Sequence, residues 1–312
     1  MIIKQSTLKL AIVLMGTPLL MNPSYGLANE EVAYNSTLWI GYTLNRSDYF
    51  DDRNSEIKPD GLNLGISQLF ADQWQIALSY GDFEGDGTWP TDRNGSDVLE
   101  RAETKSQAVG LSASWLTEDF NLSLSYSEIE NNERSLSRGP LVLELVEGKD
   151  KVFSFSYDDY FDGELFTFGW SLGIQHSDSL NRTRQTSLNE PVTVASAQFD
   201  QTSWSSFVDL DISHWFENDD FSWAPQLTLS WAWEISSSGD PLLVISRGDE
   251  RRVFTQFNDR LMGTFRTPDS GFWELSFNFD WHNDWSSSLA YGKSISAEED
   301  LESLSIDIGF SF

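Results

Sequence analysis

The last ten residues read Ser303-Leu304-Ser305-Ile306-Asp307-Ile308-Gly309-Phe310-Ser311-Phe312. Apolar side chains occupy every even position of this run, and small or polar side chains occupy every odd position. A period of two puts the apolar side chains on one face of a β-strand and the polar ones on the other. A strand of this length is also long enough to cross a lipid bilayer at a tilt. The run therefore predicts a membrane-spanning strand with a lipid face and a polar face.

The same strand ends on an aromatic residue at the carboxyl terminus. Ile308, Phe310 and Phe312 form an alternating pattern that resembles the recognition signal read by the barrel assembly machinery of Gram-negative outer membranes. The resemblance implies that this machinery is a partner of the chain and that the outer membrane is its destination.

The amino terminus predicts export. Lys4 and Lys9 precede an apolar run over residues 10–21, which has the length of a signal-peptide h-region. Small residues at Gly26 and Ala28 suit a signal peptidase, so we expect residues 1–28 to be cleaved and residues 29–312 to form one barrel domain. A retained transmembrane helix is the alternative, but it needs about twenty apolar residues, and Pro18 and Pro23 interrupt a segment of that length.

Composition narrows the functions that fit. The formal net charge is −29, which disfavours a nucleic-acid partner because the phosphate backbone attracts basic surfaces. There is no cysteine, so disulfide and thiol chemistry are excluded, and no motif points to a cofactor. The acidic charge has two readings, a well-solvated surface or a lumen that prefers cations.

The alternating pattern recurs along the chain, and most runs are separated by a short turn on one side and a long polar segment on the other. This layout is typical of an outer-membrane barrel with its short turns in the periplasm. Twelve strands are predicted, around residues 36–44, 62–66, 74–80, 109–115, 120–126, 153–157, 166–174, 204–213, 223–233, 272–281, 289–291 and 303–312.

Residues 45–60, 83–103, 128–150 and 236–271 are expected to be long outer loops. Two short β-prone runs in the last of these, residues 242–246 and 253–257, could form an extra hairpin, and a fourteen-stranded barrel is the alternative if they span the membrane. A soluble β-sandwich would also alternate, but it would bury its aromatic residues. Here aromatic residues flank the turns as an interfacial girdle would, at Trp74, Trp115, Phe120, Trp215, Phe221, Trp281 and Trp285.

The predicted inward faces carry mainly Ser, Thr, Gly and Asn. Asp209, Asp211 and Glu234 are the lumen charges that we single out, and Glu274, Asp280 and Asp307 share the inward pattern. Eight-stranded barrels are filled by their own side chains, whereas sixteen-stranded barrels leave an aqueous channel. A twelve-stranded barrel with small inward residues leaves room for a narrow wet lumen.

The order of segments is similar to the translocator barrel of bacterial autotransporters, which also has twelve strands. Residues 225–234 resemble the proline-started late strand of that family, residues 283–291 its penultimate turn and strand, and residues 303–312 its final strand. Autotransporters carry a secreted passenger before the barrel, but here only residues 29–35 stand between the predicted cleavage site and the first strand. The chain therefore resembles a solitary autotransporter-type barrel without a passenger.

Catalytic and metal sites have weak support. His176 and Ser177 suggest a serine hydrolase, but neighbouring residues on a strand point to opposite faces, so another serine such as Ser179 would have to act as nucleophile. We predict that the protein is not an enzyme. The acidic runs at residues 51–56 and 85–87 lack the full ligand pattern of an EF-hand, and solvated loops are the simpler reading.

Two functions remain open. The barrel is either a narrow pore or translocator-type conduit, or a closed barrel that binds partners through its long extracellular loops. Outer-membrane lipids and lipopolysaccharide are the expected surroundings in either case, with weak bridging by divalent cations as one mode of contact. The oligomeric state does not follow from the sequence.

Overall fold

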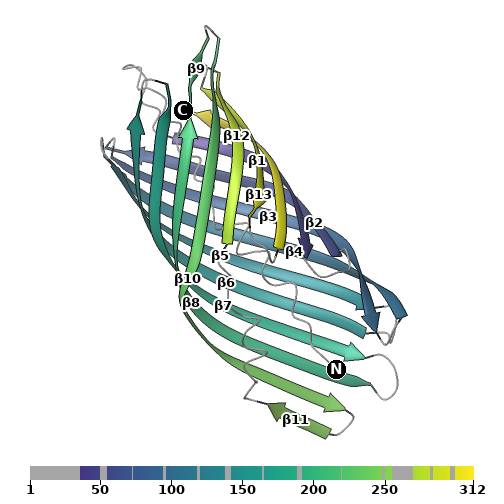
Figure 1. The fold of residues 1–312 in the computed structure, drawn as a ribbon. Coiled ribbons are helices and arrows are strands. Elements are labelled where there is room, and N and C mark those ends of the chain that lie inside the picture. The colour runs from purple at the N-terminus through teal and green to yellow at the C-terminus, as the bar shows by residue number, and fades with distance from the viewer. Residues whose placement is uncertain are drawn as a thin grey trace.

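The computed structural model describes residues 36–49, 55–71, 73–93, 96–117, 120–137, 142–163, 165–187, 192–218, 220–247, 250–254, 270–281, 284–295 and 299–312 (Figure 1). The predicted signal peptide, residues 1–28, lies outside the described residues. No helix in the described ranges is long and apolar enough to cross a membrane.

Strands make up almost all of the described chain. Their bounds are β1 Ser36–Tyr49, β2 Ser55–Phe70, β3 Trp74–Arg93, β4 Ser96–Leu116, β5 Phe120–Ser137, β6 Val142–Asp162, β7 Thr167–Ser187, β8 Thr193–Ser213, β9 Phe216–Glu217, β10 Ser222–Arg247, β11 Glu250–Phe254, β12 Ser270–Asp280, β13 Trp285–Ser294 and β14 Glu299–Ser311.

Twelve of these strands close into an antiparallel ring. Consecutive strands pair from β1 to β8, β8 pairs with β10, and β10, β12, β13 and β14 continue the ring until β14 pairs with β1. Both ends of the ring meet at one rim, where Ser36 and Phe312 exchange backbone hydrogen bonds of 3.2 and 2.9 Å. The predicted twelve-stranded barrel is confirmed.

The alternation of side chains sets which face looks outward. On β1 Leu38 and Ile40 are 50% and 53% exposed, whereas Trp39 between them is 6% exposed. Apolar side chains on the outer wall stay exposed around the ring, including Leu64, Leu78 and Ile306. A wide apolar exterior of this kind is stable only against lipid.

The described interior is mixed, with more polar than apolar buried side chains. Among the described residues, the buried side chains include serines, threonines, asparagines and two aspartates, and one small cluster of Ala108, Ile129 and Val152 forms apolar packing. The barrel is therefore held by its closed backbone ladder, in which each strand satisfies its neighbours.

Short turns join the strands at the rim where the two ends of the ring meet. The turn between β2 and β3 has Ala71 at φ 50 and a hydrogen bond of 3.2 Å from Gln73 N to Phe70 O. The turn between β12 and β13 has Asp284 at φ 69. These tight turns lie where the sequence pattern predicts them.

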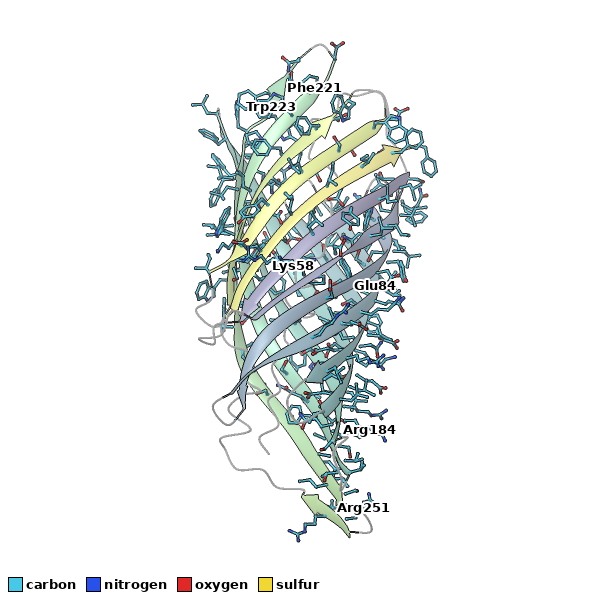
Figure 2. The ribbon with its side chains drawn as sticks, turned by 90° about the vertical axis from the view of Figure 1, so that its right-hand side faces the viewer. Lys58, Glu84, Arg184, Phe221, Trp223 and Arg251 are labelled. Carbon is cyan, nitrogen blue, oxygen red and sulfur yellow. The ribbon has the colours of Figure 1, made fainter. Side chains whose placement is uncertain are left out.

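Aromatic rings follow this rim on the outer wall. Trp74 stacks on Trp115 at 6.1 Å, Trp115 meets Phe120 at 5.9 Å, and Phe120 continues to Tyr157 at 5.4 Å. The series resumes with Phe221 against Trp281 at 5.4 Å, and Phe221 and Trp223 lie at this end in Figure 2. The predicted turn-edge girdle is thus a physical belt of rings, except that no ring contact joins Trp215 to it within the described residues.

The strands have very unequal lengths at the opposite rim. The strands β3, β4 and β6 to β8 have 20 or 21 residues and β10 has 26, whereas β12, β13 and β14 have 11, 10 and 13. Since about ten residues cross a bilayer, one side of the barrel continues as a tall sheet far beyond the membrane (Figure 1).

This tall side corrects the predicted loops. Most of residues 83–103 and 128–150, expected as polar loops, form paired strand in β3, β4, β5 and β6. Many described outward side chains of these extensions are charged, such as Glu84, Arg101 and Glu130. The apolar period of two is therefore lost over most of their length although the strand continues, with Leu136 and Leu145 as outward exceptions. A polar loop and a strand that extends into water both lack an apolar period of two, so the sequence pattern does not distinguish them.

The extra hairpin exists but does not span the membrane. Residues 243–247 of β10 pair with β11, with Val244 opposite Val253. β10 reaches this hairpin as one continuous strand paired with β8 along its length. β11 is therefore not a further strand of the closed ring. The alternative of fourteen spanning strands is therefore wrong.

Candidate functional site in the acidic lumen

Two carboxylates of β8 face the lumen. Asp209 lies between Ser171 of β7 and Ser230 of β10, and Asp211 lies between Gly169 and Thr228 of the same two strands. Both aspartates alternate with the exposed outer residues Leu210 and Ile212, which fixes their inward direction. The structure thus places these two predicted lumen charges on the inner wall, about 7 Å apart along one strand.

Two further carboxylates flank this pair. Asp158 of β6 lies opposite Ser171 from the other side, and Glu274 of β12 lies opposite Thr228. Each is therefore two strands from an aspartate of β8, about 10 Å away at the usual strand spacing. Asp158 was not among the predicted lumen residues, because its neighbour Asp159 and the nearby turn made the pair look like rim residues.

Asp307 of β14 is the most enclosed of the lumen carboxylates at membrane depth. It is 2% exposed, Ser288 Oγ donates a hydrogen bond of 3.3 Å to its Oδ2, and its Oδ1 has no hydrogen-bond partner. It lies flat over Gly41 of β1, where a Cβ atom would overlap Oδ1. Glycine at position 41 is what allows a carboxylate to lie against the wall here.

Glu234 sits higher in the barrel, at an irregularity of β10. The register shifts between Glu234 and Ser236, so Glu234 pairs with Ser205 and Ser236 pairs with Trp204. This bulge keeps both Glu234 and Ser237 on the inner side, and Ser237 Oγ donates a hydrogen bond of 2.7 Å to Glu234 Oε1. The third predicted lumen charge therefore faces inward, apart from the other five carboxylates.

Basic residues are distributed in the opposite way. The described strands carry no lysine or arginine at the depth of Asp209 and Asp211. Just beyond the lipid border, Lys105 and Lys149 face outward and pair with outward carboxylates on neighbouring strands. Arg252 pairs with the inward Ile245, but far up the tall side on β11. The described lumen is therefore lined by carboxylates with hydroxyl and amide neighbours and without a basic counter-charge at membrane depth.

Large inward rings lie flat against the wall. Phe207 covers Gly173, Phe272 covers Gly292 and Trp39 covers Gly65, so that a Cβ at each glycine would overlap the ring. A glycine on the neighbouring strand gives each ring a place to lie beside the wall instead of projecting into the lumen. The sequence pattern, read as small inward residues, missed these rings, although a glycine opposite an inward aromatic is visible once the register is known.

The residues weighed for catalysis are separated by the wall. His176 faces outward, where its ring meets Trp204 at 4.6 Å and its Nε2 lies 3.3 Å from Asp178 Oδ1. Ser177 and Ser179 face inward and are buried. The predicted opposition of His176 and Ser177 is confirmed, and Ser179 is on the far side as well.

The acidic runs give no metal site in the described residues. Residues 85–87 lie inside β3, and Asp86 faces outward at 4.0 Å from Arg101; the expectation of a loop there is wrong. Residues 51–54 lie outside the described ranges. No group of three potential ligands occurs among the residues that the structure describes.

The C-terminal strand has the predicted faces. Ile308 and Phe312 are exposed on the outer wall, and Phe310 packs against Trp285 at 4.9 Å and Phe312 at 6.0 Å. These outward rings belong to the belt at the short-turn rim. Their role as an assembly signal stays a prediction.

Solved structures with the same fold are autotransporter barrels. The translocator domain of the autotransporter NalP from Neisseria meningitidis matches with a TM-score of 0.67 and 8% identity, over 91% of this chain and 90% of that one. The transport unit of AIDA-I from Escherichia coli matches with a TM-score of 0.58 and 12% identity, over 97% of both chains. The β-domain of the Bordetella autotransporter BrkA has a TM-score of 0.58 and 10% identity, over 89% and 100%.

These identities are low, so the likeness is one of fold. The barrel is an outer-membrane type barrel similar to autotransporter translocator domains, as the sequence resemblance predicted. No protein-family model and no curated protein sequence matches the chain.

Proposed function

We propose that the chain is an integral protein of the Gram-negative outer membrane that acts as a narrow conduit with a preference for cations. The observation that carries this proposal is the lumen wall, where Asp158, Asp209, Asp211, Glu274 and Asp307 face inward without a lysine or arginine at the same depth in the described strands. The short-turn rim is then periplasmic and the tall side extracellular.

The physical basis is the field of the wall. Carboxylates grouped in a lumen with low-dielectric sides concentrate cations and repel anions. Their neighbours are Ser171, Ser230 and Thr228, whose hydroxyl groups stabilise the charge without cancelling it. The effect depends on ionic strength, because the Debye length is about 8 Å in physiological salt.

Space for solutes is the second support. The rings of Phe207, Phe272 and Trp39 lie against glycines on the wall, which leaves the centre of the barrel less occupied than their size suggests. Twelve strands enclose more room than the eight at which side chains fill a barrel. A solute of this conduit would be small and either neutral or cationic.

A second candidate function has its own observation. The tall sheet of β3 to β8 and β10 stands beyond the lipid on one side only, so the barrel presents a large surface to the medium. A closed barrel that binds a partner through this surface would need no open lumen. The long strands that replace the expected loops, residues 128–137 and 142–150, would then form part of the binding surface.

Single-channel recording separates the two functions. The refolded protein is inserted in planar bilayers under a potassium chloride gradient, and heat-modifiable mobility on gels verifies that the barrel is folded. Steady openings with a reversal potential on the cation side support the conduit. Absence of conductance from folded protein contradicts the conduit and favours the surface-binding function.

A further inference from the structure

Four basic side chains on the outer wall form what we call the β5–β7 basic patch. They are Arg134 of β5, Lys151 of β6, and Arg182 and Arg184 of β7, and all four are exposed. Arg134 and Arg184 lie on either side of Leu145, to which both are paired in register. Figure 2 shows Arg184 projecting from the outer edge of the tall sheet.

Elsewhere on the outer wall, lysines are held by carboxylates. Lys105 Nζ lies 2.6 Å from Glu84 Oε1 and 3.8 Å from Asp82 Oδ1. Lys149 contacts Glu128, and its Nζ lies 3.1 Å from Glu130 Oε1. The opposite charges of these ion pairs compensate each other, so these lysines attract an external anion only weakly.

The basic patch differs because no ion pair joins its members to a carboxylate within the described residues. Asp178 lies opposite Lys151 in register, but its carboxylate contacts His176 Nε2 at 3.3 Å instead. Glu128 lies opposite Lys151 on its other side but contacts Lys149, and Glu103 lies opposite Arg134 but is 3.8 Å from Arg101. Glu147 lies opposite Arg182, and no acidic residue lies opposite Arg184. The described acidic residues beside the patch are therefore mostly engaged by other cations, and Arg184 has none in register.

The patch begins where the lipid-facing surface ends. On β6 the last exposed aromatic residue is Phe153, and Lys151 is two positions further along, about 7 Å at the rise of a strand. On β7 the ring of His176 meets Trp204 at the same border, and Arg182 and Arg184 follow six and eight positions beyond it. The cations thus form a ladder that rises from the lipid border along the tall side.

We propose that the β5–β7 basic patch binds the phosphate groups of lipopolysaccharide in the outer leaflet. A guanidinium group binds phosphate oxygens in a bidentate manner, and a lysine ammonium adds a point charge. The phosphates of this lipid lie at the membrane border and in the sugar core above it, which matches the direction of the ladder. The inference rests on the outer-membrane placement proposed above but not on an open lumen.

The test uses the refolded protein in detergent micelles and two probes, rough lipopolysaccharide that retains its phosphorylated sugar core and the same lipid freed of its phosphates. Native mass spectrometry titrates the bound lipid. The triple variant Lys151→Gln/Arg182→Gln/Arg184→Gln should lose affinity for the phosphorylated lipid by about tenfold or more, since every 1.4 kcal/mol is tenfold and each charge-assisted contact is worth that order. The phosphate-free lipid should bind both proteins equally.

Arg251→Gln is the matched control. Arg251 is an exposed arginine of β11, at the far end of the tall side (Figure 2), and forms no ion pair with a described residue. Its removal should leave lipid binding unchanged, and heat-modifiable mobility verifies that each variant is folded. Equal binding of phosphorylated lipid by the triple variant, or equal loss in Arg251→Gln, overturns the proposal.

Channel recording keeps this inference separate from the proposed function. The triple variant should conduct as the wild type does, because its residues face away from the lumen. A wild-type barrel that binds phosphorylated lipid but does not conduct would remove the conduit and leave the basic patch supported.

Discussion

Three consecutive residues show how differently the two sides of the wall treat charge. Lys149 and Lys151 face outward, where Lys149 meets Glu128 and Glu130, whereas Asp150 between them faces inward and is 0% exposed. In sequence the run reads as a cluster of opposite charges. The period of two separates it into an outer belt of ion pairs and an inner carboxylate with hydroxyl and amide neighbours.

The two sides also shift acidities in opposite directions just beyond the lipid border. The hydrogen bond from Lys149 lowers the pKa of Glu128 on the outside. Burial raises the pKa of Asp150 on the inside, only partly opposed by a hydrogen bond from Ser179. Asn131 Nδ2 lies 3.5 Å from Asp150 Oδ2, and Oδ1 has no hydrogen-bond partner. Charging Asp150 on the inner wall therefore costs desolvation free energy, whereas the partly exposed Glu128 on the outer wall keeps its charge in contact with water and Lys149.

The largest effect is expected where the inner wall has no room to adjust. Gly41→Ala would place a Cβ against Asp307 Oδ1 at the closing pair of β1 and β14. Overpacking costs typically about 1–3 kcal/mol and occasionally more, and this overlap is deep, so the yield of refolded barrel on heat-modifiability gels should fall sharply.

A second variant identifies the cause. Gly41→Ala/Asp307→Ala removes the overlapping carboxylate and should recover most of the refolding yield. Gly110→Ala is the control, because a Cβ there meets chiefly the mobile hydroxyl of Ser79. A double variant that folds no better than Gly41→Ala would show that the overlap is not what limits assembly.

An intermediate effect is expected at Asp150. Because folding raises its pKa, the folded state is favoured below the ordinary value of 3.8, and this contribution is lost as the pH rises through the folded-state pKa. Asp150→Asn should therefore raise stability at pH 7 by about 1–3 kcal/mol, the usual cost of a buried polar group left unsatisfied. Thermal unfolding at pH 7 and pH 3.5 measures this, and the gain should disappear at the acidic pH.

The smallest effect is expected on the outer wall. Lys149→Gln removes the ion pairs with Glu128 and Glu130, but exposed pairs contribute little in ordinary salt. Since the pKa of Glu128 is lowered, its contribution is present above 4.5 and lost as the pH falls through the folded-state pKa. The unfolding midpoint at pH 7 should hardly change. A shift as large as that of Asp150→Asn would contradict the claim that charges on the outer wall affect stability less than charges on the inner wall.

The sequence predicted what the lipid contact dictates. Alternation over residues 303–312 and around Leu38 and Ile40 is imposed by a wall with one face in lipid, so the strand number, the turn-edge rings and the inward direction of Asp209, Asp211 and Glu234 were all readable. The likeness to autotransporter barrels followed from the order of the same segments.

The features that the sequence did not predict include the strand extensions beyond the lipid border, where the outer face no longer has to be apolar. Above the border the outward side chains of β5 and β6 are mostly charged or polar, so this extension looked like a loop. Asp158 was missed because it stands beside Asp159 and a short turn, although the alternation after Phe155 and Tyr157 already directs it inward. The rings over glycines and the overlap between Asp307 and Gly41 depend on the pairing register, which a single strand does not reveal.

The most direct test of the acidic lumen is the reversal potential of the wild type and of Asp209→Asn/Asp211→Asn under the same salt gradient. A cation about 7 Å from one carboxylate is attracted by about 0.6 kcal/mol in water, which raises its local concentration about threefold. The wild type should reverse on the cation side. The reversal potential of the double variant should move toward zero, because the cation enrichment from both carboxylates is lost. An unchanged reversal potential in a folded, conducting double variant would contradict the account.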